Sequence, residues 1–598
     1  MDNNTEYSEI RFQLNRFFDS QTDLLLIQIS ILGLFIGIMP ISIPFFSDLL
    51  RSGGAFVLSF FAPGYLITRL LFKRISFEER AVLAIAFSLL VTPLLVGIVV
   101  VSPFSLSVWP VFGIECATVF TLSVIVGSRC DPVTPAFSVR RWTAYLSFGV
   151  LGIGIRLYPS LGFSSYTTLW MPPNQMYPVL YLLRTGELLN RGVINPSTAF
   201  GSTVLTYTKS FGFIFQQASI LLLSGVELPQ GMLVLNQYLP IIGIFAIPIA
   251  GPAIGELISR EMENPLRDST AIGLFLIGLL PSYRFLEYTS RYLMSSSVYA
   301  FFLIVMVIWA LLASATDRRD PRKYLLCLAA FAIAVPLYYY TAGLLLLIVL
   351  LPTLLTAAFL FRSTNYGNLV LLIGISIASY YMFITDKLFS AYLYTILSIA
   401  GLATDVSTGA ALGTGGVSLT DVLVYLNMML ITVLLGIYVL WTLFRWNKSE
   451  YVGKYLALTI CSLGLIGPLL LAWRGLGGLS RLNVYAVVVL LPAAALILSI
   501  DWDRQAIHQI AVIILSLIII TSIVPFVFGN VTVPKQLTQE EESMAEWSVE
   551  QDGIVFTSFR VGTAPFLHDD LEMSGITGEG QDTEEVIRAI YYNPNEEQ

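Results

Sequence analysis

The chain contains many uninterrupted apolar runs of about 20 residues, the length at which an α-helix crosses the hydrocarbon core of a bilayer. Of its 598 residues, 56% are hydrophobic and only 12% are charged, a composition typical of integral membrane proteins. We therefore predict an all-α polytopic membrane protein with about fifteen transmembrane helices, and we expect ionisable residues to stay out of these helices. The predicted spans are residues 24–46, 54–72, 81–101, 109–127, 142–161, 232–257, 270–286, 297–315, 324–340, 341–361, 369–384, 422–444, 455–471, 484–500 and 507–528.

Basic residues predict how these spans are oriented, because short cytoplasmic loops are enriched in Lys and Arg. They occupy alternate loops: Arg69, Lys73, Arg74 and Arg80; Arg129, Arg140 and Arg141; Arg260 and Arg267; Arg318, Arg319, Arg322 and Lys323; Arg362; Arg445, Lys448 and Lys454; and Arg504. We expect a multi-pass protein of the cell membrane with a cytoplasmic N-terminus and an extracellular C-terminal region. The polar start and the long run Leu24–Phe46 favour a retained signal anchor over a cleaved signal peptide.

Three regions are predicted along the chain. They are an N-terminal four-span membrane module (1–135), a membrane core (136–528) with outer loops 158–231 and 385–421, and an extracytoplasmic C-terminal domain (529–598). The first outer loop is expected to hold two amphipathic interfacial helices, Met176–Leu189 and Phe211–Leu223. The C-terminal domain is predicted to be a small α/β unit, because a β-rich segment precedes a helical one.

The turn between the seventh and eighth spans carries the most informative charges. Arg284, Glu287 and Arg291 are spaced three and then four residues apart, which places them on one face of a helix. Charges at a membrane boundary are costly unless they are paired, hydrated or used. The turn is therefore a candidate functional site, and the alternative is a salt-bridge cluster that anchors a helix at the interface.

Five arginines on the predicted outer side run against the positive-inside trend. They are Arg156, Arg284, Arg291, Arg474 and Arg481. Each could extend its guanidinium to lipid headgroups. Together they predict a binding site for an anionic group, with a lipid-linked phosphate as the first candidate. One guanidinium group can donate two parallel hydrogen bonds to two phosphate oxygens.

Composition also excludes several chemistries. The two histidines, His508 and His568, are too few and too far apart for a zinc site or a Ser-His-Asp triad. The four scattered cysteines predict neither a disulfide framework nor a metal site. A net charge of −7 argues against a nucleic-acid partner. Acid–base chemistry must then depend on carboxylates.

The order and sidedness of short motifs over residues 142–528 resemble the GT-C superfamily of polytopic glycosyltransferases, and archaeal members in particular. The motifs are Leu157-Tyr-Pro-Ser, Leu182-Leu-Arg-Thr-Gly-Glu187, Leu280-Pro-Ser-Tyr-Arg284 and Tyr338-Tyr-Tyr-Thr-Ala-Gly343, preceded by Phe61-Ala-Pro-Gly-Tyr65 and Glu78-Glu79, which resemble a module attached to archaeal surface-glycan membrane proteins. The resemblance implies transfer of a sugar, most naturally mannose, from dolichyl (polyprenyl) phosphate to a lipid- or protein-linked glycan. The expected setting is N-glycosylation of surface-layer glycoproteins at the outer face of the membrane.

The chain departs from that family in its first outer loop, where an acidic residue is usual. The corresponding stretch is Trp170-Met-Pro-Pro-Asn-Gln175, and Asn174 cannot act as a base. Glu287 is our first candidate for the catalytic carboxylate and Glu187 our second, although Thr185-Gly-Glu187 also resembles an ordinary helix end. The third interpretation of the missing loop carboxylate is that the protein has lost catalysis. The outer arginines would hold the phosphate, so a divalent metal is allowed but not required.

Three other functions compete with a glycosyltransferase. A flippase or transporter would show inverted repeats and charges near the middle of the bilayer, and neither stands out in the sequence. A polysaccharide polymerase or ligase would also use outer arginines on lipid phosphates. A non-catalytic scaffold derived from a glycosyltransferase would fit the missing loop carboxylate.

Overall fold

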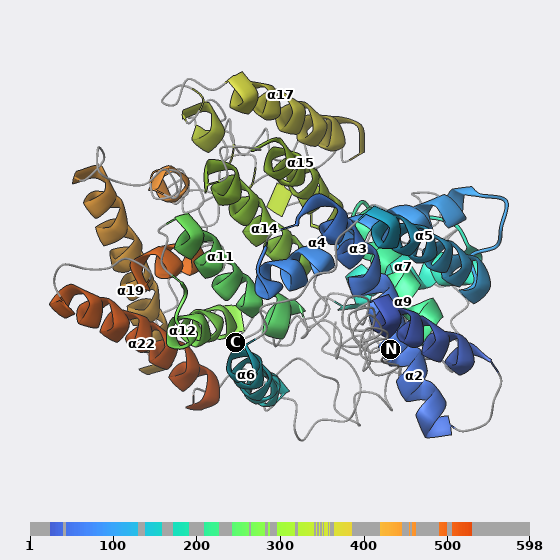
Figure 1. The fold of residues 1–598 in the computed structure, drawn as a ribbon, viewed down its shortest axis with the longest axis horizontal. Helices are drawn as coiled ribbons and strands as arrows, with labels where there is room; N and C mark the ends of the chain where they lie inside the picture. The colour runs from blue at the N-terminus through green and yellow to red at the C-terminus, as the bar shows by residue number, and fades with distance from the viewer. Residues whose placement is uncertain are drawn as a thin grey trace, which may run out of the picture.

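Figure 1 shows the fold of the chain in a computed structural model. It describes residues 24–39, 44–73, 75–129, 138–157, 172–189, 208–225, 242–261, 265–281, 285–286, 296–316, 321–339, 364–384, 419–444, 490–498 and 505–528, with shorter pieces at 342–343, 346, 350, 352–356, 358, 454 and 457–461. These residues form helices, and no strand occurs among them. The predicted α/β domain, 529–598, lies outside the described residues, so its fold stays a prediction.

Most of the described helices overlap the predicted apolar runs. The first is Leu24–Ile38. The others are α2 (Pro44–Phe56), α3 (Ala62–Leu71), α4 (Phe77–Val101), α5 (Val108–Arg129), α6 (Val139–Leu157), α7 (Pro172–Thr185), α9 (Phe211–Ser224), α11 (Ile247–Glu261), α12 (Asp268–Leu279), α14 (Ser296–Thr316), α15 (Pro321–Tyr338), α17 (Thr364–Ser379), α19 (Leu419–Phe444) and α22 (Gln505–Phe528), with π-helical turns η1 (Val57–Phe61), η3 (Ile242–Ala246) and η4 (Tyr380–Ile384).

Five helices in the described ranges are long and apolar enough to cross a membrane. They are Leu50–Leu71, Phe77–Val101, Val108–Arg129, Ser296–Ala315 and Pro321–Tyr338. An all-α, membrane-embedded character is therefore supported. The full count of about fifteen spans stays a prediction.

Local chemistry explains where several helices begin and end. The helix α4 begins four residues before the predicted span because Ser76 and Glu79 form a reciprocal capping box, in which Glu79 N donates to Ser76 Oγ (3.1 Å) and Ser76 N donates to Glu79 Oε2 (2.9 Å). Prolines end the predicted spans early. The helix that begins at Leu24 ends at Ile38, just before Pro40, and α12 ends at Leu279, just before Pro281.

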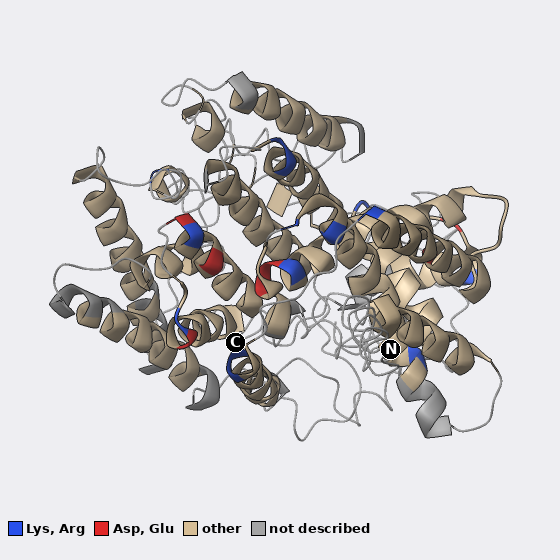
Figure 2. Cartoon of the chain, in the orientation of Figure 1, with Lys and Arg blue, Asp and Glu red and all other residues tan. Residues whose placement is uncertain are grey.

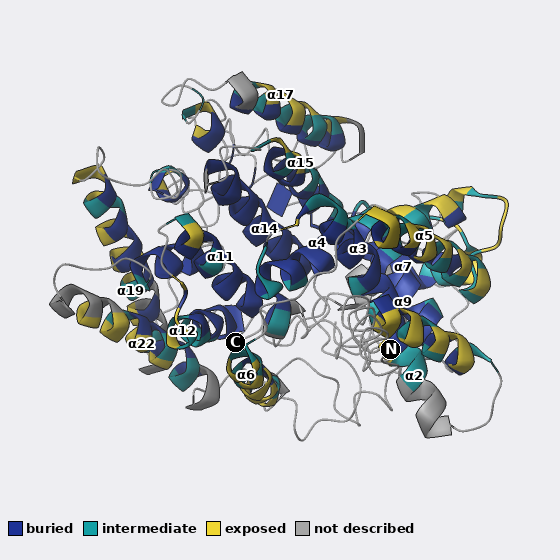
Figure 3. Ribbon diagram, in the orientation of Figure 1, coloured by how far each residue is buried: buried dark blue, intermediate teal, exposed yellow. Residues whose placement is uncertain are grey.

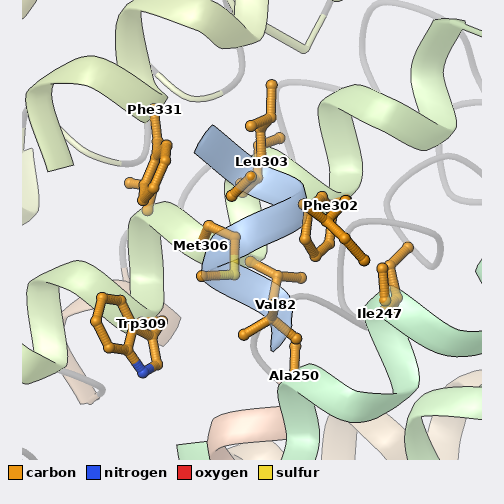
Figure 4. Packing of buried hydrophobic residues seen from close by; sticks show 14 of the residues in the cluster. Val82, Ile247, Ala250, Phe302, Leu303, Met306, Trp309 and Phe331 are labelled. Carbon is orange, nitrogen blue, oxygen red and sulfur yellow. The ribbon is translucent and has the colours of Figure 1, made fainter. Parts of the chain in front are cut away.

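The helix α14 lies at the centre of the molecule. Every residue from Ser296 to Ala315 is buried, and α4, α11 and α15 pack around it. Figure 4 shows Phe302, Leu303 and Met306 of α14 packed against side chains of these neighbours, among them Val82 and Phe331. This core draws on helices from both sides of the predicted boundary at residue 135, since α4 also packs against α9 and α11.

Exposed apolar side chains cover the outward faces of the peripheral helices. Figure 3 shows exposed residues along α5, α6 and α17, whereas α14 is buried throughout. Phe120, Val150 and Ile375 are examples of large apolar side chains on these faces. A water-soluble protein rarely exposes so much contiguous apolar surface, so lipid is the environment that these faces fit.

Candidate functional site

Most of the predicted site residues lie outside the described residues. These are Arg284, Glu287, Arg291, Arg474 and Arg481. Two residues between Arg284 and Glu287 are described: Phe285 is 1% exposed and Leu286 is 0% exposed. Apolar side chains between Arg284 and Glu287 are thus inserted into the protein core. Arg156 lies in the last turn of α6.

Glu187 follows a helix end, as one of the two sequence interpretations predicted. The helix α7 ends at Thr185, Gly186 adopts a left-handed conformation with φ of 72°, and Gly186 N donates to Leu182 O at 2.9 Å. Glu187 is exposed, and its N–H donates to Thr185 Oγ1 at 3.1 Å. This geometry favours the structural interpretation of Glu187.

A cluster of six charged residues joins four helices at one end of the molecule, and we call it the basic-end cluster. It consists of Glu78, Glu79, Arg141, Glu256, Arg260 and Asp268. Arg141 is its centre: its guanidinium donates to Asp268 Oδ1 at 2.6 Å and to Glu256 Oε1 at 2.5 Å, and its Nη1 lies 3.6 Å from Glu78 Oε1. Arg260 pairs with Glu79.

Electrostatics keep Arg141 charged. Burial lowers the pKa of Arg141, but the hydrogen bonds to Glu256 and Asp268 outweigh it, so that its pKa lies above the ordinary value. A third donation, to Leu266 O at 2.5 Å, satisfies a backbone carbonyl in the loop between α11 and α12.

The basic-end cluster brings together loops that the sequence predicts to share one side of the membrane. The starts of α4, α6 and α12 and the last turns of α11 meet there. Lys323, near the start of α15, has its Nζ 5.8 Å from the ring centroid of Phe72, which follows α3. Figure 2 shows these charges at helix ends. The side of the membrane that this end faces stays a prediction.

A second polar cluster lies within the apolar core, and we call it the Glu115 cluster. It consists of Ser59 of η1, Glu115 of α5 and Ser219 of α9, all three fully buried. Ser219 Oγ lies 2.6 Å from Glu115 Oε1, Ser59 Oγ lies 3.2 Å from Glu115 Oε2, and the two hydroxyl oxygens are 2.9 Å apart. The expectation that ionisable residues avoid the predicted spans is therefore wrong at Glu115.

Glu115 is placed well inside its helix. It lies about 10 Å along the axis of α5 from Val108. The isolated Glu within Ile114-Glu-Cys116 could have been noticed in the sequence. Its partners could not, because Ser59 and Ser219 are 56 and 104 residues away.

The backbone carbonyl of Ser59, in the π-helical turn η1, joins two neighbouring helices. The carbonyl of Ser59 would accept from residue 63 in a regular α-helix, but Pro63 has no N–H. Instead, Thr92 Oγ1 donates to Ser59 O at 2.8 Å and Gln216 Nε2 donates to it at 3.2 Å. The proline thus frees a carbonyl that binds α4 and α9 into the same polar region.

The helix α9 is buried, and this corrects the prediction that Phe211–Leu223 lies at the interface. Its residues Gly212 to Ser224 are buried except for Phe215 and Leu222. Gln217 Nε2 donates to Tyr299 Oη at 2.7 Å, Tyr299 stacks on Tyr338 with ring centroids 5.4 Å apart, and Tyr338 Oη donates to Leu89 O at 2.8 Å. This chain of contacts joins α9 to α14, α15 and α4.

In the described ranges, no group of three His, Cys, Asp or Glu side chains is placed to hold a metal ion. The described residues therefore offer the chemistry of a carboxyl group with two hydroxyl partners at Glu115, and of paired charges at the basic-end cluster. No protein-family model matches the chain, and no curated protein matches it either.

Proposed function

We propose that this chain is a membrane glycosyltransferase of the GT-C type, which moves a sugar from dolichyl phosphate to a lipid- or protein-linked glycan at the outer face of the membrane. Mannose is the sugar we propose first, and surface-glycoprotein N-glycosylation the process. The observation that supports this most is the burial of Phe285 and Leu286, which anchors the turn containing Arg284 and Glu287.

The position of this turn also supports the proposal. The helix α12 begins at Asp268 in the basic-end cluster and runs about 18 Å to Leu279, so that Pro281 lies away from that cluster. Nucleotide sugars are cytoplasmic, and a site at the other end of the molecule would need a lipid-linked donor. A lipid monophosphate matches a small group of arginines.

In the proposed reaction, Glu287 accepts the proton of the acceptor hydroxyl as its oxygen attacks the anomeric carbon. The bond from that carbon to the phosphate oxygen breaks on the opposite side, which inverts the anomeric centre. Arg284 and Arg291 stabilise the leaving lipid phosphate, and Arg156, Arg474 and Arg481 are further candidates for this role. Arginines can neutralise a monophosphate alone, so a divalent metal is not required.

The decisive experiment introduces the substitution Glu287→Gln in a strain whose surface-glycoprotein glycan depends on this protein. The amide keeps the size of the carboxylate but cannot accept the proton. We expect surface glycoprotein whose glycan lacks only its last sugar, with sugar-charged dolichyl phosphate accumulating, as in a deletion strain. Glu187→Gln is the matched control and should leave the glycan complete.

Other outcomes separate the competing functions. Normal glycans in the Glu287→Gln strain with altered glycans in the Glu187→Gln strain would move the catalytic role to Glu187. Normal glycans in both strains, with altered glycans only on deletion, would favour a non-catalytic scaffold. Normal glycans in the deletion strain would refute a role in this process.

A flippase or transporter is the second candidate, and a specific observation favours it. Glu115 is a buried carboxyl inside a predicted transmembrane helix, a position that transporters often use. This function predicts that deletion removes whole glycans from the surface glycoprotein and leaves lipid-linked glycan on the cytoplasmic side. Loss of a single sugar would count against it.

A further inference from the structure

The Glu115 cluster forms a closed ring of three polar contacts. Each pair among Ser59, Glu115 and Ser219 is within hydrogen-bonding distance, and the contacts measure 2.6, 2.9 and 3.2 Å. Within the part of the chain that the structure describes, Glu115 has only these two side-chain partners. Among the described residues, the two hydroxyls also donate to no acceptor outside the ring.

A count of protons distinguishes two states of this ring. Three hydrogen bonds need three donated protons, and a serine hydroxyl supplies one. The two serines therefore supply two, which leaves one contact without a proton when Glu115 is an ionised, acceptor-only carboxylate. A protonated Glu115 supplies the third. The bonds then run in one direction around the ring, because the protonated carboxyl oxygen donates to one serine, that serine donates to the other, and the second serine donates to the remaining carboxyl oxygen.

The cost of burying a charge also favours a protonated Glu115. An ionised carboxylate buried without a cation is very costly, and such a group takes up a proton instead. Glu115 belongs to none of the ion pairs among the described residues. The ionisable residues on the helices packed against it, α3 and α4, and on α5 itself are Tyr65, Arg69, Glu78, Glu79, Arg80, Cys116 and Arg129.

In the described ranges, none of these residues is a hydrogen-bond partner of Glu115. Cys116 follows it in the chain, whereas Glu78 and Glu79 belong to the basic-end cluster and Arg129 ends α5 far along the helix. The segments η1 and α9 contribute hydroxyl and amide groups but no ionisable side chain. Arg51 of α2, a helix that packs on η1 and α9, donates to Leu222 O and Leu223 O. Among the described residues, the surroundings of Glu115 therefore offer it hydrogen bonds but no ion pair.

We propose that Glu115 is a proton-binding site, and that its bound proton closes the ring and fixes α9 to η1 and α5. The ligand is a proton. The site uses none of the residues proposed for glycosyl transfer: Glu115 and Ser59 belong to the predicted N-terminal module, and Ser219 belongs to α9. Because α9 belongs to the predicted outer loop 158–231, loss of the proton would loosen that loop from the module.

Infrared spectroscopy of the purified full-length protein in lipid nanodiscs tests the protonation directly. The wild-type spectrum at neutral pH should contain the carbonyl-stretch band of a protonated carboxyl, and Glu115→Gln should remove that band. The Glu187→Gln protein is the matched control and should keep it. Loss of a carboxylate band on Glu115→Gln, with the protonated-carboxyl region unchanged, would overturn the proposal.

Stability measurements provide a second, independent test. An amide both donates and accepts, so Glu115→Gln can replace the neutral acid and should change the unfolding equilibrium constant less than about threefold. Glu115→Val leaves two buried hydroxyls poorly satisfied and should raise that constant at least about fivefold. Raising the pH to alkaline values should lower the free energy of unfolding of the wild-type protein but not that of the Glu115→Gln protein. Equal destabilisation by Gln and Val would indicate an ionised Glu115 and would overturn the proposal.

Discussion

Arg141 connects more helix ends than any other side chain in the basic-end cluster, and its replacement should be correspondingly costly. Arg141→Ala leaves Glu78, Glu256 and Asp268 close together without their shared cation. We expect the free energy of unfolding to fall by roughly 3 kcal/mol. Arg140→Ala is the control, because Arg140 is exposed and should contribute under about 1 kcal/mol. Denaturant titration in detergent measures both, and equal effects would contradict the central role of Arg141.

Gly225 combines two constraints at the end of α9. Its φ of 65° is left-handed, and a Cβ built on it would lie 1.8 Å from Cζ of Arg51. Arg51 there donates to Leu223 O at 2.9 Å and to Leu222 O at 3.2 Å. Gly225→Ala should therefore destabilise the protein by more than the roughly 1–2 kcal/mol of the conformation alone.

Gly186 is a suitable control for that substitution. Its φ of 72° is similar, but a Cβ there meets nothing within 4 Å. Gly186→Ala should cost only the conformational part, roughly 1–2 kcal/mol. Comparable melting temperatures for the two variants would show that the contact of Arg51 with the end of α9 contributes little.

Residue-scale predictions succeeded where the cause is local. The end of α7 at Thr185-Gly186 could be recognised because the glycine and its neighbours specify the turn. The Glu115 cluster could not be assembled in the same way. It joins η1, α5 and α9, and only the packing of these helices determines which polar groups meet.

At the scale of helices, the crossing of α3 and α4 depends on Gly64. A Cβ on Gly64 would lie 1.9 Å from Ala84 O and 2.5 Å from Ser88 N, both backbone atoms that cannot move aside. Gly64→Ala should destabilise the protein by roughly 3 kcal/mol through this overlap. Gly113→Ala in α5 is the control, since a Cβ there meets nothing within 4 Å and alanine favours helix. A melting temperature of Gly64→Ala equal to that of the wild type would contradict this packing.

Helix positions were largely predictable from apolar runs, but the predicted helix ends were wrong where proline or a capping box sets them: the predicted spans ran past Pro40 and Pro281 and began four residues after the start of α4. The π-helical turn η1 was not predicted. It lies within a mainly apolar run, so that hydropathy does not distinguish it from a regular helix. The buried setting of α9 was also missed, because polar Gln216 and Gln217 indicate an interfacial helix unless their partners are known.

For the whole molecule, the alternation of basic loops predicts that the two ends face opposite sides of the membrane. Ser105, exposed between α4 and α5, lies at the end away from the basic-end cluster, whereas Arg140 is exposed near it. In a cysteine-free background, Ser105→Cys should react with an impermeant thiol reagent in intact cells. Arg140→Cys should react only after the membrane is permeabilised. The reverse pattern would invert the predicted orientation.

The membrane class follows from composition alone, because so many apolar runs leave no soluble arrangement. The catalytic assignment does not follow in this way. Arg284 and Glu287 lie outside the described residues, and only the burial of Phe285 and Leu286 between them connects the predicted turn to the core. Motif order can suggest a reaction, but it does not place two side chains on one substrate.

The wide turn η1 has a consequence for the evolution of this chain. A π-helical turn holds one residue more than the α-helical turn it replaces, and each residue rotates a helix by about 100°. Deleting a single residue within Val57–Phe61 would therefore swing Arg51 about a quarter of a circle away from α9, although Ala62–Leu71 stayed in place. Related chains should tolerate many substitutions in this helix but almost no change in its length.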